Sequence, residues 1–206
     1  MSNRTACETE RARAVARRRE LLVEAAHELL VSRGFHGLSL EEVARKAGVT
    51  RKTVYNHFGS KLGLLEAIFD AVATKGEVWR LMEAAEFPDL REAIARAVEA
   101  SCRLWSSDRE LLRRLVGLAA VDPETASVVM EREQRREATW ARLVQRLAAA
   151  GMLRPGVSPD QAVRASMALT SFATFDALAP PDAPPAATVE LLLRLLSGIV
   201  DLSGSG

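Results

Sequence analysis

The chain has 206 residues, 48% of them hydrophobic, which is enough for one large or two small domains with an apolar core. Its two cysteines, Cys7 and Cys102, fit neither a metal-ligand spacing nor a disulfide framework, so we expect a reducing compartment and no metal site. No segment reaches the roughly 18 apolar residues of a membrane span, and the polar segment 1–20 lacks the apolar centre of a signal peptide. These features predict a cytoplasmic protein without a membrane partner.

The net charge of +1 hides an uneven distribution along the chain. Residues 1–75 contain 13 Lys and Arg against 9 Asp and Glu, whereas the remainder has an excess of acids. Between Val43 and Leu65 there are five cations and no acid. A local basic patch is typical of a protein that binds a polyanion, although on charge alone a solvated surface is an equally good interpretation.

Helical patterns dominate the N-terminal part, and no alternating strand pattern is present. Apolar residues at helical spacing predict a first helix over residues 17–33, which Gly34 ends. Ser39 and Glu42 have the spacing of a capping box, in which the Ser oxygen accepts a first-turn amide and the Glu bonds back to the cap. A second, short helix is therefore expected before Gly48, and the tight turn predicts a helix-turn-helix.

A third helix is expected from the Thr50 cap to Phe58, with Val54 and Phe58 on its buried side. The remaining positions all carry hydrogen-bonding groups, and they are Arg51, Lys52, Thr53, Tyr55, Asn56 and His57. The major groove of B-DNA admits one α-helix, where Arg, Lys and Asn pair with base edges and hydroxyl or cationic groups bind phosphates. This pattern favours a helix that lies in the groove over a surface helix that only bridges two others.

Residues 37–69, GLSLEEVARKAGVTRKTVYNHFGSKLGLLEAIF, resemble the DNA-binding segment of the TetR family of bacterial transcriptional regulators. The resemblance rests on the capped helix, the Ala-Gly-Val turn, Tyr-x-His-Phe and the following Ser-Lys. It implies an all-α fold of about nine helices, with an N-terminal three-helix helix-turn-helix domain and a C-terminal helical ligand-binding and dimerisation domain. It also implies a homodimer, by family default a repressor, that binds palindromic double-stranded operator DNA and is released by a small-molecule effector.

The resemblance also assigns roles to individual residues of this sequence. Phosphate contacts fall on Ser39, Tyr55, His57 and Lys61. The positions at which the family reads bases are Arg51, Lys52, Thr53 and Asn56, and Thr50 completes the DNA-binding set as the cap of the groove helix. Because the base-reading identities vary within the family, the operator sequence is not predicted.

The remainder of the chain reads as helices without a comparable signature. They are expected over residues 60–83, 88–105, 109–121, 122–151, 158–179 and 188–202, with a proline-rich loop before the last. The expected domains are 1–60, with 1–15 as a flexible arm, and 61–206.

Large or soft apolar side chains on the central helices suit a cavity for an apolar or aromatic effector, although core packing is the commoner role of such residues. The candidates are Cys102, Trp105, Met130, Trp140, Met167, Phe172 and Phe175, with Ser171 as a polar anchor. The last two helices offer apolar faces for a dimer interface, although these faces fit the monomer core equally well. The interface candidates are Ala165, Leu169, Phe172, Leu191, Leu195 and Ile199.

Sequence motifs for catalysis and for cofactors are absent, since the chain has no glycine-rich phosphate loop, no H-E-x-x-H and no G-x-S-x-G. We therefore expect neither an enzyme nor a cofactor. The alternative to a DNA-binding protein is a helical module that binds a membrane or a protein through the basic amphipathic segment 11–30. The acids in the second half of this segment weigh against that alternative.

Overall fold

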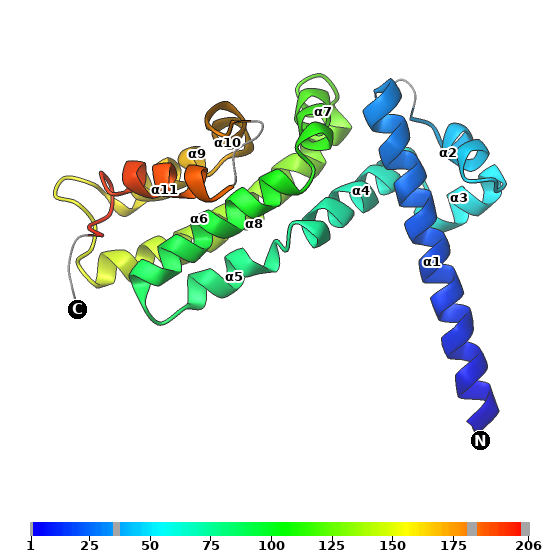
Figure 1. Ribbon diagram of the computed structural model, residues 1–206, viewed down its shortest axis with the longest axis horizontal. Helices are drawn as coiled ribbons and strands as arrows, with labels where there is room; N and C mark the ends of the chain where they lie inside the picture. Colours follow the sequence, from blue (N-terminus) through cyan, green and yellow to red (C-terminus); the bar gives the residue numbers. More distant parts are fainter. Residues whose placement is uncertain (1, 35–37, 181–184, 203–206) are drawn as a thin grey trace. The chain divides into compact units, whose positions relative to one another are not determined.

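The computed structural model describes residues 2–34, 38–180 and 185–202, with side chains from Glu10 onward (Figure 1). The described residues form eleven α-helices, and their only β-pairing is an isolated bridge between Leu153 and Val200. The all-α prediction is confirmed, with more helices than the nine or so expected. No helix in these ranges has the length and apolar character needed to cross a membrane.

The chain divides into two compact units. Unit 1 comprises residues 1–71 and 113–126, and unit 2 comprises residues 72–112 and 127–206. Unit 1 contains α1 (Ser2–Arg33), α2 (Leu40–Lys46), α3 (Arg51–Phe58), most of α4 (Lys61–Lys75) and most of α7 (Arg109–Ala119). Unit 2 contains α5 (Trp79–Glu86), α6 (Leu90–Ser107), most of α8 (Pro123–Ala149), α9 (Pro159–Leu169), α10 (Phe172–Leu178) and α11 (Pro185–Leu196). The expected functional division after residue 60 remains a proposal.

The first helix is longer than the sequence pattern predicted. α1 begins at Ser2, so residues 2–15 are helical where a flexible arm was expected. Most residues of this segment are Ala, Arg and Glu, which all have high helix propensity. The later turns of α1 bury Leu22, Ala26, Leu29 and Leu30, and they share the unit 1 core with Val43, Val54, Leu64 and Ile68.

Caps place the two short helices of unit 1. The Ser39 Oγ atom accepts a hydrogen bond from the Glu42 amide at 3.1 Å, and Thr50 Oγ1 accepts one from the Thr53 amide at 3.2 Å. The return half of the expected capping box is replaced, because the Glu42 carboxylate forms ion pairs with Arg33 and Arg45. Gly59 ends α3 at a φ of 70°, a left-handed conformation that residues with a Cβ rarely adopt.

The long helix expected over residues 60–83 is divided between α4 and α5. The break follows Lys75, where Gly76 approaches α6 so closely that a Cβ atom would lie 2.7 Å from Leu104 Cα. Glu77, the next residue, has a φ of 53°. Close packing of backbone against backbone therefore interrupts a segment whose local sequence favours a continuous helix.

The helix expected over residues 158–179 is also divided. α9 ends at Leu169, and Ser171 caps α10 by accepting the Thr174 amide at 3.2 Å. The Thr170 carbonyl at the break accepts hydrogen bonds from the Trp105 indole at 2.8 Å and from the Arg136 guanidinium at 3.3 Å. Distant side chains thus satisfy a carbonyl at the end of α9.

The last helix is shifted toward the N-terminus relative to the expected 188–202. α11 covers Pro185–Leu196, and the chain then turns into the bridge between Leu153 and Val200. Ile199, an expected interface residue of this helix, therefore lies beyond its end.

Candidate nucleic-acid interface

The third helix has one buried side. Val54 is 0% exposed and is the only residue of α3 that is fully buried. Phe58, which was expected in the core, is partly exposed; its ring lies 5.4 Å from the Arg19 guanidinium carbon and 6.0 Å from the His57 ring. The correction follows from its position in the last turn, where α3 leaves the unit 1 core. One valine therefore carries most of the apolar anchoring of this helix.

The other side of α3 faces solvent with polar groups. Arg51, Lys52, Tyr55 and Asn56 are exposed, and the Tyr55 side chain reaches 59% exposure. Thr53 and His57 are partly buried. No acid occurs in α3, so this surface carries only neutral and positive groups. It has the shape, hydrogen-bonding groups and charge sign that a DNA groove requires.

Ion pairs within unit 1 reduce the number of cations in the basic patch that are available to a partner. Arg45 and Arg33 both contact the Glu42 carboxylate, and Lys46 contacts Glu28. The hydrogen bond from Arg45 lowers the pKa of Glu42, so this carboxylate is charged at neutral pH. Across the described part of the chain, Arg51 and Lys52 have no such carboxylate partner.

Lys61 begins α4 directly after Ser60, whose Oγ atom accepts the Gly63 amide at 3.0 Å. The side chain of Lys61 is partly buried. Burial lowers the pKa of its ammonium group, and the negative charges of Asp122 and Glu124 oppose part of that effect. A phosphate at this position would therefore meet a lysine that already lies in the field of two carboxylates.

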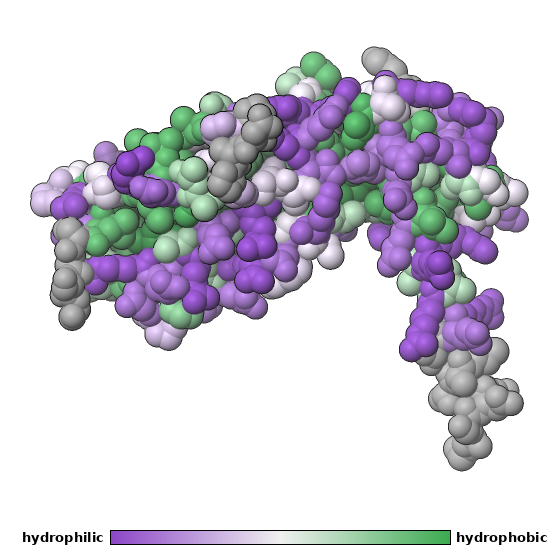
Figure 2. Space-filling view, viewed as in Figure 1, coloured by the Kyte–Doolittle hydropathy of each residue, from purple (hydrophilic) through white to green (hydrophobic). Residues whose placement is uncertain are grey.

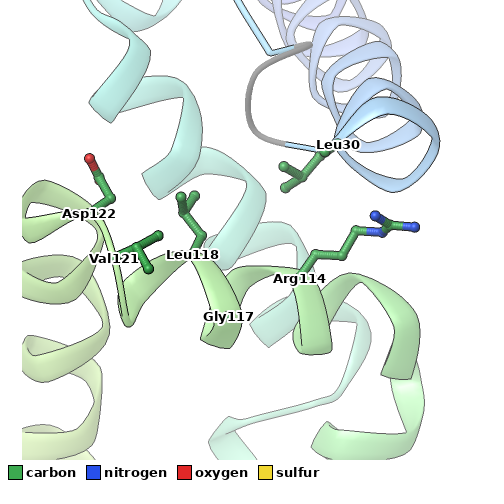
Figure 3. A pocket seen from close by; sticks show the side chains of 7 residues that line it. Leu30, Arg114, Gly117, Leu118, Val121 and Asp122 are labelled. Atoms are coloured by element: carbon green, nitrogen blue, oxygen red, sulfur yellow. The ribbon is translucent and has the colours of Figure 1, made fainter.

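Unit 1 also contains an open cavity of about 440 Å³ (Figure 3). It lies between the C-terminal end of α1 and the segment from α7 to the start of α8, and its lining residues are Leu30, Gly34, Arg114, Gly117, Leu118, Val121 and Asp122. Figure 3 shows Leu118 and Val121 as its apolar wall, with Arg114 and Asp122 at different ends. None of the residues expected to bind an effector lines this cavity.

The residues expected to bind an effector lie in unit 2, and the structure brings some of them together. The Trp105 and Phe172 rings pack edge to face with centroids 5.8 Å apart, and Cys102, Trp140 and Phe175 are buried. Burial raises the pKa of the Cys102 thiol to about 12. Met130, by contrast, is 56% exposed on α8 and lies outside the core.

The polar anchor expected at Ser171 has a local structural role, because its oxygen caps α10. Met167 is partly buried, and its carbonyl accepts a hydrogen bond from Arg136 at 3.2 Å. Sequence analysis missed Arg136, a buried arginine whose guanidinium carbon lies 5.9 Å from the Trp105 ring centre. Its only sequence signal is its position one helical turn before Trp140 on the same side of α8.

The interface candidates divide between core and surface. Phe172 is buried, whereas Ala165, Leu169, Leu191 and Ile199 are partly exposed and Leu195 is 44% exposed. On α11, the residues that point into the unit 2 core are instead Leu192 and Leu196. Figure 2 shows hydrophobic surface over the region of α9 to α11. This surface is available to a second chain.

A short capped helix, a tight turn and an exposed basic helix on a three-helix core define a helix-turn-helix protein. Residues 22–68 match the family model described as bacterial regulatory proteins, tetR family. This chain belongs to the tetR family, as the sequence resemblance predicted.

Three similar proteins illustrate the match. The HTH-type transcriptional regulator SrpR of Pseudomonas putida is 41% identical over 68 residues, which are 33% of this chain and 29% of SrpR. The HTH-type transcriptional activator FasR of Mycolicibacterium smegmatis is 46% identical over 52 residues, which are 25% of this chain and 23% of FasR. This chain thus spans less than a third of these two curated relatives.

The similarity to a solved structure extends further. The crystal structure of NalD, described as the secondary repressor of the MexAB-OprM multidrug efflux pump in Pseudomonas aeruginosa, has a TM-score of 0.71 and 29% identity to this chain. The superposition covers 90% of this chain and 96% of the NalD chain. Each of the three similar proteins is described as a regulator, activator or repressor, and none as an enzyme.

Proposed function

We propose that this chain is a transcriptional regulator, most simply a repressor, that binds palindromic operator DNA as a homodimer and is released by a small-molecule effector. The observation that carries the proposal is α3, a helix with one buried valine and an exposed side of Arg51, Lys52, Tyr55 and Asn56. The match of residues 22–68 to the tetR family and the description of NalD as a repressor support it.

The proposed division of labour follows from position on the helix. Arg51, Lys52 and Asn56 read base edges, because their side chains are exposed on the side of α3 opposite Val54. Thr53 is a base-reading candidate with a constraint, since its hydroxyl lies 2.9 Å from that of the Thr50 cap. The phosphate contacts are Ser39, Tyr55, His57 and Lys61.

A dimer is proposed because α3 is short. Its eight residues extend about 12 Å, so one copy touches only a few base pairs and useful specificity requires two half-sites. The hydrophobic surface over α9 to α11, with Leu191, Leu195 and Ala165 partly or largely exposed, supports a two-fold interface there.

An apolar or aromatic effector is proposed to bind in unit 2 near Trp105, Phe172 and Trp140. Supporting this is a buried aromatic cluster that also contains an unsatisfied donor, since the Trp140 indole N–H is buried without a hydrogen-bond partner in the described residues. A ligand acceptor or a water molecule would remove the cost of leaving that group unpaired. An effector lowers operator affinity only if it binds the DNA-free conformation more tightly.

The alternative of a membrane- or protein-binding helix is not favoured. Its amphipathic segment, residues 11–30, belongs to α1, and the apolar side chains Leu22, Ala26 and Leu30 are buried in the unit 1 core. A helix cannot offer the same apolar residues to a membrane surface without unfolding that core.

The decisive experiment is selection of bound DNA from a random duplex pool by the full chain. The expected result is a two-fold symmetric consensus with half-sites roughly 34–36 Å apart, or a multiple of that distance. A consensus without symmetry, a monomer on DNA, or no enrichment would contradict the proposal. Sedimentation with lipid vesicles in place of DNA would point to the alternative.

A further inference from the structure

The segment from α7 to the first turn of α8 belongs to the same compact unit as the helix-turn-helix. Residues 113–126 cluster with residues 1–71, and the cavity in Figure 3 shows Leu118, Val121 and Asp122 facing a space that Leu30 of α1 also lines. This segment contributes two acids, Asp122 and Glu124, to a unit whose candidate DNA-binding surface is otherwise basic.

Asp122 is held in place by the start of α8. One of its carboxylate oxygens accepts the Thr125 amide at 2.8 Å and the Thr125 hydroxyl at 2.6 Å. These bonds, together with the charge of Lys61, lower the pKa of Asp122, which is therefore ionised at neutral pH. Glu124 lies in the first turn of the same helix and is exposed.

Lys61 is the residue of the helix-turn-helix unit on which both carboxylates act. It is partly buried at the start of α4, where a lysine side chain has few directions available. A lysine ammonium is a compact point charge that binds one anion at a time at close range. The carboxylates of the α7–α8 turn and a DNA phosphate are therefore competitors for the same group.

We propose that Asp122 and Glu124 are positioning residues that hold the Lys61 side chain and weaken its contact with a DNA phosphate. The proposal deepens the DNA-binding function above and rests on it. It assigns an affinity-setting role to the α7–α8 turn, outside the helices that touch DNA. The acids make no contact with DNA themselves, and their whole effect on DNA affinity passes through Lys61.

A double-mutant cycle tests this dependence. The chain, Glu124→Gln, Lys61→Ala and the double variant are titrated against a mixed-sequence duplex at low salt, where phosphate contacts dominate binding. Glu124→Gln is expected to tighten binding about twofold to fivefold when Lys61 is present, the effect of losing one exposed charge pair. In the Lys61→Ala background the same change is expected to leave the dissociation constant unaltered.

Two further variants separate an effect that passes through Lys61 from a general effect of removing negative charge. Glu137→Gln removes the same charge from an exposed position on α8, about 20 Å further along the helix, and is expected to change nothing. Asp122→Asn removes the charge while the amide oxygen still accepts from Thr125, and is expected to tighten binding as Glu124→Gln does. Equal tightening with and without Lys61, or no tightening by either variant, would overturn the proposal.

A measurement without DNA distinguishes failure of this inference from failure of the DNA-binding function. The chain has four lysines, Lys46, Lys52, Lys61 and Lys75, so the Lys61 side chain is readily assigned by NMR. The pKa of Lys61 is expected to fall in Glu124→Gln and to stay constant in Glu137→Gln. A constant pKa in both would refute the positioning role even if DNA binds, whereas a fall in a protein that binds no duplex would refute only the DNA-binding function.

Discussion

The attachment of α3 to unit 1 depends on Val54, and replacing this residue tests that dependence. Val54→Ala removes two methyl groups from a side chain that is 0% exposed. At about 0.8 kcal/mol for each buried carbon, the transfer cost is about 1.6 kcal/mol, and the cavity left behind adds to it. We expect unit 1 to lose about 2–3 kcal/mol of its free energy of unfolding.

The loss has a functional consequence because α3 has only eight residues. A helix of this length is not stable alone in water, so its structure depends on packing against the core. Val54→Ala is expected to weaken binding to all DNA sequences without altering the selected consensus, because the base-reading side chains are unchanged.

Urea denaturation followed by circular dichroism measures the stability change, and fluorescence anisotropy measures DNA binding. Tyr55→Phe is the matched control, since Tyr55 is 59% exposed and its hydroxyl has no role in the core. It is expected to stay within about 0.5 kcal/mol of the parent stability while weakening DNA binding. A Val54→Ala protein as stable as the parent, or one with an altered consensus, would refute the role assigned to this contact.

Three further predictions concern charge, specificity and reactivity. Lys61→Ala and His57→Ala should weaken binding equally for all sequences, and Lys61→Ala should reduce the salt dependence by about one phosphate contact, as measured by titration at several salt concentrations. Asn56→Ala should instead change the selected consensus, at roughly 1–3 kcal/mol per lost base contact; an unchanged consensus would exclude base reading by Asn56. Since burial raises the Cys102 pKa to about 12, its thiol stays protonated at pH 8, and alkylation should be slow until urea unfolds unit 2. Rapid alkylation in the folded protein would contradict this burial.

The helix-turn-helix was predictable because its signals are local. Ser39 and Thr50 each bond an amide three residues away, and glycines end the helices within the same few residues. Such caps act within one turn of helix, so the sequence contains both partners of each bond at fixed spacing. The exposed side of α3 follows in the same way from helical periodicity around Val54.

The features that only the tertiary structure decided depend on contacts between residues far apart in the chain. The break between α9 and α10 depends on Trp105 and Arg136, which bond the Thr170 carbonyl from two other helices. The break after α4 depends on the approach of Gly76 to Leu104, and the environment of Lys61 depends on Asp122. Local patterns could not predict these features, because the residues involved are neighbours only once the helices have packed.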